Sequence, residues 1–317
     1  MPGVTDQMRG PAVRPLTDDD DLEGLNADNP LGWLVLLWRE MAKGSDLEVH
    51  WFVGLLDGRP VGVAAACPRS LAAAGYGKGA VTVLSQARRH GVGSALRDAV
   101  AGVCRGRVPG IEYIYSEADD ESAAAAAAWG LTEVGRHRES VLHLTEIDRG
   151  LLEAKASAAR AVDVTLATLP PLDQLTEADW RLIHEFVSAR WRETPDANGA
   201  DDPMPYALFR NMLTEPWMLM TAKRGGEYVG ATLVDVRPGD AKAVNVMITG
   251  VAPQTRRQGV AAALKARHAL LLADQGFQQI YTQNMDGNAP ILASNTSMGF
   301  VPAAGYVAVH QHLTAIG

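Results

Sequence analysis

The sequence predicts an α/β protein that carries two tandem copies of one domain. The chain has 317 residues, and a single hydrophobic core rarely serves more than ~250–300 residues, so two domains are expected. Two stretches of the chain repeat the same landmarks in the same order. Strand patterns alternate with helical patterns in both stretches, which is the order of a mixed α/β fold.

The duplication rests on glycine-containing landmarks that keep one spacing. Three pairs share nearly the same offset: Gly62 and Gly230 (230 − 62 = 168), the loops that begin at Arg88 and Arg256 (256 − 88 = 168), and Gly130 and Gly299 (299 − 130 = 169). A glycine turn, a glycine loop and a late glycine in one order and one register indicate a repeated domain.

The strands of the two copies are predicted from their apolar patterns. A glycine-containing pair marks a hairpin turn in each half, Asp57-Gly58 and Gly225-Gly226, because these residues accept positive φ. The predicted strands are residues 49–56, 61–67 and 80–84 in the first half and residues 217–223, 228–236 and 246–251 in the second.

The border between the copies lies where one strand pattern stops and the next begins. Residues 141–144 have the pattern of a last strand, and residues 146–161 are rich in Ala, Lys, Glu and Arg, which predicts a helical or irregular linker. The expected division is a disordered lead at 1–14, a first domain at 15–148, a linker at 149–161 and a second domain at 162–317.

Composition argues against several classes of protein and site. No apolar run approaches the ~20 residues that span a bilayer, and the lead lacks the parts of a signal peptide, so we expect a cytoplasmic protein without a membrane partner. The net charge of −8, with no long basic run, disfavours nucleic acid as a partner. Cys67 and Cys104 are far apart without metal-ligand spacing, so we expect buried thiols and neither a disulfide nor a metal site.

The chemistry is expected at a loop that joins a strand to a helix in each half. The loops are Arg-Arg-His-Gly-Val-Gly at 88–93 and Arg-Arg-Gln-Gly-Val-Ala at 256–261. Each ends at a helix N-terminus, where the first backbone N–H groups lack intrahelical partners and the helix dipole is positive, so they can hold a diphosphate. Glycine and alanine in the loops keep side chains out of its way.

Two alternatives to this interpretation remain open. A Rossmann fingerprint needs Gly-x-Gly-x-x-Gly directly after a strand, and neither loop has the leading glycine. A plain strand-to-helix turn, with a glycine for close packing, is the other alternative. Recurrence of the loop in register favours a functional role.

These landmarks resemble those of the GNAT superfamily of N-acetyltransferases over nearly the whole chain. The strand, the Arg-x-x-Gly-x-Gly/Ala loop and the late Gly-Leu or Gly-Phe pair carry the resemblance, and Asn284 and Asn288 look like those of an actinobacterial-type branch that includes tandem proteins. The resemblance implies two tandem domains, each a mixed, mostly antiparallel twisted sheet that is splayed at the acyl-CoA site and flanked by helices.

The resemblance also implies an activity, a co-substrate and a partner. An acetyl group would pass from acetyl-CoA, without a metal, to a primary amine of a small molecule by direct attack. The protein would be a monomer with two pseudo-equivalent domains or a homodimer. The alternative is an acetyl-CoA-binding scaffold or sensor in which one or both domains do not catalyse.

Cofactor-binding residues follow from the same resemblance. The loop amides would hold the pyrophosphate of CoA at Arg88, Arg89, His90, Gly91, Val92, Gly93 and Ser94 in the first half, and at Arg256, Arg257, Gln258, Gly259, Val260, Ala261 and Ala262 in the second. The preceding strand would pair with pantetheine at Val83 and Leu84 or at Gly250 and Val251. Asn288 would contact pantetheine or cap a helix.

The expected catalytic residues lie in the second half. The family often supplies the proton for the departing thiolate from a tyrosine four residues before the late glycine, but here Ala126 and Asn295 occupy these positions. Asn295 can hydrogen-bond the sulfur but is not an acid. Tyr306, at the start of the last strand, is the candidate proton donor, with packing as the alternative. We therefore expect the C-terminal domain to be the better catalyst.

Overall fold

The computed structural model describes residues 10–43, 47–68, 75–194 and 204–313. We call the part from the first to the sixth strand the N-terminal half. Its helices and strands are β1 (Ala12–Pro15), α1 (Leu22–Leu25), α2 (Gly32–Ala42), β2 (His50–Leu56), β3 (Arg59–Cys67), β4 (Gly77–Val83), α3 (Val92–Cys104), β5 (Gly110–Ser116), α4 (Asp120–Ala128) and β6 (Thr132–His143).

The C-terminal half repeats this order from strand to strand. Its helices and strands are α5 (Arg149–Ser157), β7 (Thr165–Thr168), α6 (Glu177–Arg192), α7 (Tyr206–Met212), β8 (Leu219–Arg224), β9 (Glu227–Val236), β10 (Ala243–Val251), α8 (Val260–Asp274), β11 (Gln279–Met285), α9 (Ala289–Thr296) and β12 (Val301–His312). All six predicted strands are confirmed, with ends that differ by up to three residues. Among the described residues, no helix is both long and apolar enough to cross a membrane.

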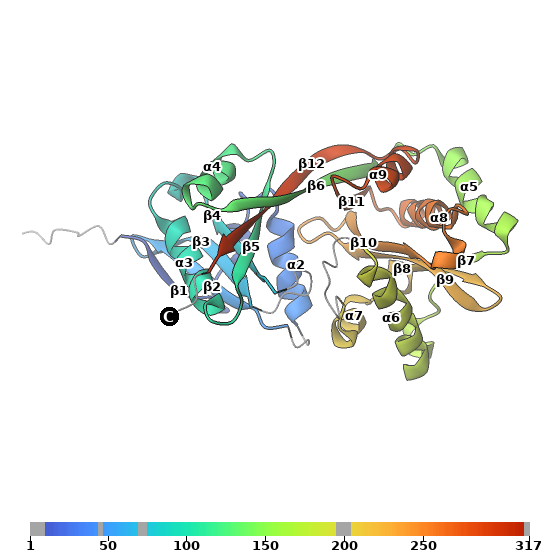
Figure 1. Cartoon of the computed structure of the whole chain (residues 1–317), viewed down its shortest axis with the longest axis horizontal. Helices are drawn as coiled ribbons and strands as arrows, with labels where there is room; N and C mark the ends of the chain where they lie inside the picture. Colours follow the sequence, from blue (N-terminus) through green and yellow to red (C-terminus); the bar gives the residue numbers. More distant parts are fainter. Residues whose placement is uncertain (1–9, 44–46, 69–74, 195–203, 314–317) are drawn as a thin grey trace, which may run out of the picture.

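All strands belong to one continuous sheet that runs through both halves. The order is β1-β2-β3-β4-β5-β12-β6-β11-β10-β9-β8-β7. Within each half the pairing is antiparallel except for one parallel pair, β4 with β5 and β10 with β11. Figure 1 shows the two halves at opposite ends of the molecule, with the long strands β6 and β12 crossing between them.

The last strands of the two halves are exchanged. Strand β12 pairs along β5 of the N-terminal half, with Tyr306 opposite Ser116 and His312 opposite Gly110. Strand β6 pairs along β11 of the C-terminal half, with His143 opposite Gln279. Each half therefore completes its sheet with a strand from the other.

Helices cover both faces of the sheet in each half. In the N-terminal half, α3 packs on one face through Val92, Leu96 and Val100, and α1 packs on the other through Leu22 and Leu25. In the C-terminal half, α8 and α5 cover one face and α6 and α7 the other. The continuous apolar run of β3 fits this arrangement, because successive side chains of a strand point to opposite faces and helices cover both.

The first repeated glycine has a packing reason in both halves. A Cβ at Gly62 would lie 2.6 Å from Thr82 O on β4 and 3.2 Å from Leu96 Cδ1 on α3, and a Cβ at Gly230 would lie 2.8 Å from Leu264 Cδ1 on α8. Both leucines keep the offset of 264 − 96 = 168. The glycine thus lets the helix that follows the loop approach the sheet closely.

One expectation about the borders needs correction. Residues 12–14 were predicted to lie in a disordered lead, but they form part of β1, which pairs with β2; residues 1–9 lie outside the described residues. The linker at 149–161, expected to be helical or irregular, contains α5, which lies on α8 and buries Leu152. The division into domains at 15–148 and 162–317 stays a prediction.

A buried ion pair joins the two halves near α2. Arg237 donates to Glu139 Oε1 (3.1 Å) and to Asn245 Oδ1 (3.0 Å). Its guanidinium lies over the rings of Trp33 (4.5 Å) and Tyr281 (3.9 Å). The Arg237 and Glu139 side chains are only 13% and 8% exposed, so each charge depends on the other.

We expect Arg237→Ala to lower the free energy of unfolding by about 3–5 kcal/mol, because it leaves the Glu139 carboxylate buried without its partner. Urea unfolding followed by circular dichroism measures this change. The control is Arg136→Ala, which breaks an ion pair with Glu133 whose side chains are 47% and 48% exposed, for a loss of less than ~1 kcal/mol. Equal losses in the two variants would contradict this role for the buried pair.

Candidate functional site

The two glycine loops have the same backbone conformation in both halves. Arg89 and Arg257 have positive φ of 66° and 60°, and Gly91 and Gly259 have φ of 82° and 79°. A non-glycine residue in the left-handed region costs of order 1 kcal/mol, so its recurrence indicates a constrained loop. Successive N–H groups in such a turn form an anion-binding concavity.

Each loop leads into a helix whose first amides are unused. The first hydrogen bond of α3 joins Ala95 N–H to Gly91 O (3.1 Å), and that of α8 joins Ala263 N–H to Gly259 O (2.9 Å). The amides of Val92, which starts α3, and of the two residues after it therefore lie outside the helical ladder. Both loops keep the geometry needed to hold a diphosphate.

The parallel strands separate next to each loop. Among the described residues, β4 and β5 pair only at Gly77–Ile111 and Lys78–Glu112, although β4 continues to Val83. Strands β10 and β11 pair as far as Val246 and Thr282, and β10 has a bulge directly after this point. Beyond these pairs the facing edges of β4 and β10 offer backbone groups to a ligand.

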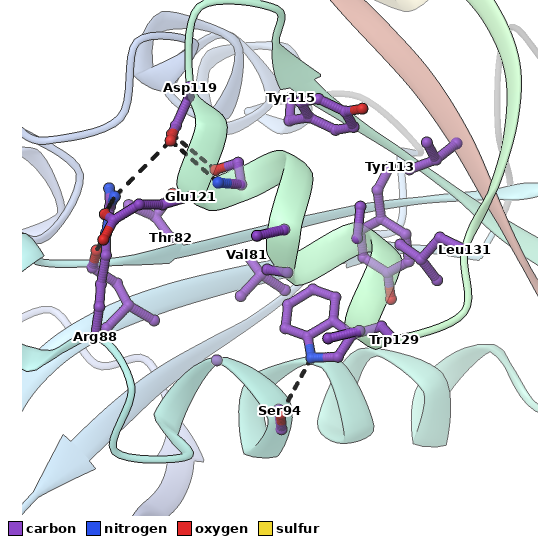
Figure 2. A pocket seen from close by; sticks show the side chains of 18 of the residues that line it. Val81, Thr82, Arg88, Ser94, Tyr113, Tyr115, Asp119, Glu121, Trp129 and Leu131 are labelled. Carbon is purple, nitrogen blue, oxygen red and sulfur yellow. Dashed lines mark hydrogen bonds and ion pairs between the residues drawn. The ribbon is translucent and has the colours of Figure 1, made fainter.

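A cavity of about 280 Å³ occupies the separation in the N-terminal half. Figure 2 shows Arg88 and Asp119 at one end of this cavity, and Tyr113, Trp129 and Leu131 at the other, with Val81 between them. It is lined by Asn29, residues 81–83, Arg88, Arg89, Gly91, Gly93, Ser94, residues 113–115, Asp119, Glu121, Ser122, Ala124, Ala125, Ala126, Ala128, Trp129, Leu131 and Val309. We call this the N-terminal cavity.

The mouth of the N-terminal cavity is charged. Arg88 Nε donates to Val83 O (3.2 Å), and the Arg88 guanidinium forms an ion pair with Glu121. Arg88 Nη1 also lies 3.9 Å from Asp119 Oδ1. Arg89 is exposed beside it, so two guanidinium groups stand next to the amides of the loop.

The inner end of the N-terminal cavity is apolar and closed by α4. Trp129 Nε1 donates to Ser94 Oγ (3.1 Å), which ties α4 to α3. Tyr113 is 6% exposed and donates to Gln311 Oε1 (3.1 Å). Burial raises the pKa of Tyr113, so its phenol stays neutral. Ala126 places only a methyl group on the part of this wall before Trp129.

The corresponding space in the C-terminal half is occupied by a polar cluster. Lys265 Nζ on α8 donates to Asn295 Oδ1 (2.7 Å) on α9. Asn295 Nδ2 in turn donates to Asn284 Oδ1 (3.0 Å) on β11. Lys265 and Asn295 are 6% and 1% exposed. The side chains of Lys265, Asn295 and Asn284 therefore occupy the region between α8, α9 and β11.

One face of β10 is covered by α6. A Cβ at Gly250 would lie 2.4 Å from Cβ of Arg190 on α6, so the stem of Arg190 rests on this strand. Arg190 forms an ion pair with Glu193 (2.9 Å), and Glu193 also pairs with Arg256 of the loop. The C-terminal loop keeps its shape, while the strand and helix beside it are packed against side chains.

The burial of Lys265 predicts how the free energy of unfolding changes with pH. Burial lowers the pKa of Lys265 to about 8. Because this lies below the ordinary value of 10.5, the unfolded chain binds more protons between these pH values, and the free energy of unfolding rises with pH by up to about 1.4 kcal/mol per unit. We expect Lys265→Met to lack this contribution.

Urea unfolding at pH 7, 8, 9 and 10 tests the prediction as a difference between the wild type and Lys265→Met. Lys242→Met, which replaces an exposed lysine, is the control and should keep the wild-type slope. A slope that is the same in all three proteins would show that Lys265 carries no such penalty.

The predicted catalytic residues lie apart from the N-terminal cavity or are already engaged. Both polar atoms of the Asn295 amide bond within the protein, which favours a structural role over contact with a sulfur atom. Strand exchange carries Tyr306 to the N-terminal half, where it pairs with Ser116 and His137 and its ring stacks on His137 at 4.4 Å. A catalytic role for either residue stays a prediction.

The other predicted binding residues have mixed surroundings. Leu84 N–H donates to Val61 O (2.9 Å), so this amide already pairs with β3. Asn288 stands at the N-cap of α9 without a side-chain capping bond, whereas Asp119, its counterpart at 288 − 119 = 169, caps α4 through Ser122 N–H (3.1 Å). Gln258 accepts from Arg224 (2.7 Å), and His90 Nδ1 lies 2.8 Å from Arg88 O.

Both cysteines are buried, as predicted, and neither forms a disulfide. Burial raises the pKa of Cys104 to about 11, so this thiol is not a nucleophile at neutral pH. The residues that sequence analysis missed are those of the cavity wall, above all Trp129 and Tyr113. The run of alanines at 123–128 was the available signal, because such a run leaves space on one helix face.

Comparisons with known proteins show similarity to acetyltransferases. Residues 18–130 match the model of the Acetyltransferase (GNAT) family. The chain is 28% identical over 256 residues to a mycothiol acetyltransferase of Clavibacter michiganensis, covering 78% of this chain and 75% of that protein. It is 27% identical over 229 residues to a mycothiol acetyltransferase of Catenulispora acidiphila, covering 69% and 68%.

Solved structures share the architecture. A tandem GNAT protein from the clavulanic acid biosynthesis pathway superimposes with a TM-score of 0.72 at 18% identity, covering 97% of this chain and all of that one. A GCN5-related N-acetyltransferase from Sphaerobacter thermophilus has a TM-score of 0.67 at 15% identity, covering 96% and 97%. These similarities extend over both halves.

Proposed function

We propose that this chain, whose residues 18–130 match the model of the Acetyltransferase (GNAT) family and whose fold is similar to that of a tandem GNAT protein, binds acetyl-CoA in the N-terminal cavity and acetylates a small primary amine there. GNAT enzymes use acetyl-CoA as co-substrate. The observation that carries the proposal is the N-terminal cavity itself, which joins an anion-binding loop to an apolar interior between two separated strands.

The mouth of the cavity suits the phosphates of CoA. The free amides at the start of α3 would donate to the pyrophosphate, and Arg89 would supply a charge beside them. Arg88 now pairs with Glu121 across the mouth. A phosphate could replace the carboxylate as its partner, since a guanidinium binds both in the same geometry.

The separated strands suit the pantetheine arm and the thioester. Beyond Lys78, the edge of β4 that faces β5 offers N–H and C=O groups that can pair with the amides of pantetheine as an added strand would. A backbone N–H on this edge would also stabilise the oxyanion that forms when an amine attacks the carbonyl carbon. The C–S bond then breaks, CoA leaves as a thiolate, and the proton lost by the amine passes through water to this thiolate.

The sequence favoured the C-terminal half as the catalyst, but the geometry favours the N-terminal half. The C-terminal loop keeps its conformation, yet Lys265, Asn295 and Arg190 occupy the space beside it. Entry of a thioester there would require displacing a buried lysine and its hydrogen bonds, at a cost of several kcal/mol. In the N-terminal half, alanines stand at the same wall.

The acceptor is proposed as a primary amine on a small molecule. The matched relatives are named for mycothiol, so amino sugars and amino thiols belong in the panel of acceptors to be tried. The net charge of −8 is compatible with a cationic amine, because opposite charge raises its local concentration.

Titration calorimetry and a thiol-release assay test the proposal together. We expect acetyl-CoA to bind with one site per chain and CoA to appear when a suitable amine is added. Tight binding without CoA release across a broad amine panel would favour the alternative, a scaffold or sensor. Absence of acetyl-CoA binding would contradict both.

A further inference from the structure

We propose that the N-terminal cavity accepts acyl chains longer than acetyl, with butyryl-CoA as the diagnostic ligand. This inference rests on the proposed function and concerns the acyl group that the same site takes. Three observations support it: the small side chains of α4, the apolar inner end of the cavity, and the contrast with the C-terminal half.

The face of α4 that lines the cavity is made of small residues. Ser122, Ala125, Ala126 and Trp129 follow one another at i, i+3, i+4 and i+7, so they form one stripe along the helix. Three of the four have side chains of one or two heavy atoms. Trp129 alone is large, and its indole is fixed at the end of the stripe by Ser94 (3.1 Å). The stripe is therefore a groove with a closed end.

In the C-terminal half, the corresponding stripe on α9 carries larger side chains. At the offset of 169, the stripe reads Ile291, Ser294, Asn295 and Met298. Asn295 fills the position of Ala126 and holds the buried Lys265. Lys265 corresponds to Arg97 (265 − 168 = 97), whose guanidinium lies over the Trp129 ring (5.2 Å) and pairs with Asp98 (2.6 Å). The smaller side chain of Ala126 at the Asn295 position therefore accounts for open space in the N-terminal half.

The inner end of the cavity suits an alkyl chain in its chemistry. Its lining is apolar, with Val81, Leu131 and Val309 around the Tyr113 ring. The Tyr113 hydroxyl is directed to Gln311 (3.1 Å), and burial keeps this phenol neutral. The charged groups Arg88, Asp119 and Glu121 lie at the mouth, as Figure 2 shows. A longer acyl chain would thus bury methylenes without burying a charge.

The gain in binding free energy for each buried methylene can be measured. Each buried CH₂ is worth ~0.8 kcal/mol, which is about fourfold in Kd, so butyryl-CoA should bind up to roughly 15-fold tighter than acetyl-CoA. Titration calorimetry of the full chain with CoA, acetyl-CoA, propionyl-CoA and butyryl-CoA gives this series directly.

Two variants of α4 test whether the tighter binding of butyryl-CoA depends on the stripe. Ala126→Leu fills the stripe, so the ratio of the acetyl-CoA Kd to the butyryl-CoA Kd should fall to about one. Ala127→Leu makes the same change at an exposed position outside the cavity lining and should keep the wild-type ratio. If Ala126→Leu does not fold, Ala125→Leu tests the same wall at a less buried position.

The outcomes separate this inference from the proposed function. Binding of CoA and acetyl-CoA without any gain for longer chains would overturn the inference and leave the proposed function standing. A gain that persists in Ala126→Leu and Ala125→Leu would also overturn it. Failure of CoA itself to bind the wild type would overturn both.

Discussion

Gly91→Trp is expected to weaken acetyl-CoA binding and to lower kcat/KM by at least roughly 100-fold. The indole would stand where the pyrophosphate meets the amides of α3. Hydrogen bonds to a charged group are worth about 1.5–3 kcal/mol each, so losing two of them gives a loss of this size. Titration calorimetry and the thiol-release assay measure the two effects.

Gly259→Trp is the matched control for this variant. Gly91 and Gly259 have nearly the same φ, 82° and 79°, so the backbone strain of a side chain in the left-handed region is the same in both variants. A Cβ at Gly91 would also lie 3.3 Å from Pro11 Cγ, whereas one at Gly259 would meet nothing within 4 Å, so circular dichroism must show that Gly91→Trp keeps its fold. We expect Gly259→Trp to keep acetyl-CoA binding and turnover within about threefold of the wild type. The reverse pattern, with turnover lost only in Gly259→Trp, would assign catalysis to the C-terminal half.

Separation of the halves is expected to abolish folding of the N-terminal half. A fragment of residues 1–148 lacks β12, which pairs with β5 at seven positions from Tyr306 to His312 and buries Val307 and Val309 in the core of this half. Each of these valines contributes about 1.5–3 kcal/mol, and an open edge at β5 invites aggregation. A typical domain has only ~5–15 kcal/mol in total.

Co-expression of residues 149–317 with this fragment provides the control. The second fragment supplies β12, so we expect a non-covalent complex that unfolds cooperatively and binds acetyl-CoA. Circular dichroism and size-exclusion chromatography compare the fragment alone with the complex. A fragment 1–148 that folds alone and binds acetyl-CoA would show that the exchanged strand is dispensable.

Much of the fold could be predicted from the sequence because its causes are local. A glycine that admits Leu96 or Leu264, a turn that needs positive φ, and a strand that alternates apolar side chains are each encoded within a few residues. The repeat offset then showed that both halves use the same elements. These local features led to the mixed sheet, the helices and the tandem arrangement.

The exchange of strands could not be predicted in this way. The apolar pattern of β12 fixes which side chains face the core, but it does not determine whether the neighbouring strand is β5 or β11. The same limit affected Tyr306, which was expected near the acyl group of the second half and instead stacks on His137 of the first.

The difference between the N-terminal cavity and the filled space in the C-terminal half could not be predicted from the sequence either. Lys265 and Asn295 are 30 residues apart, and an exposed helix lysine is the ordinary expectation. Only their juxtaposition shows that this lysine is buried against the amide and that the C-terminal space is filled. Ala126 was noticed for the tyrosine it lacks, but its part in an open wall depends on Trp129, Tyr113 and Val309 around it.

Amide hydrogen exchange of the full chain with and without CoA tests most directly whether the N-terminal cavity is the acyl-CoA site. We predict slower exchange on CoA binding in peptides that cover residues 88–94 and 119–126, with no change in those that cover residues 256–262. Protection confined to residues 256–262 would contradict the account and return the cofactor to the C-terminal half.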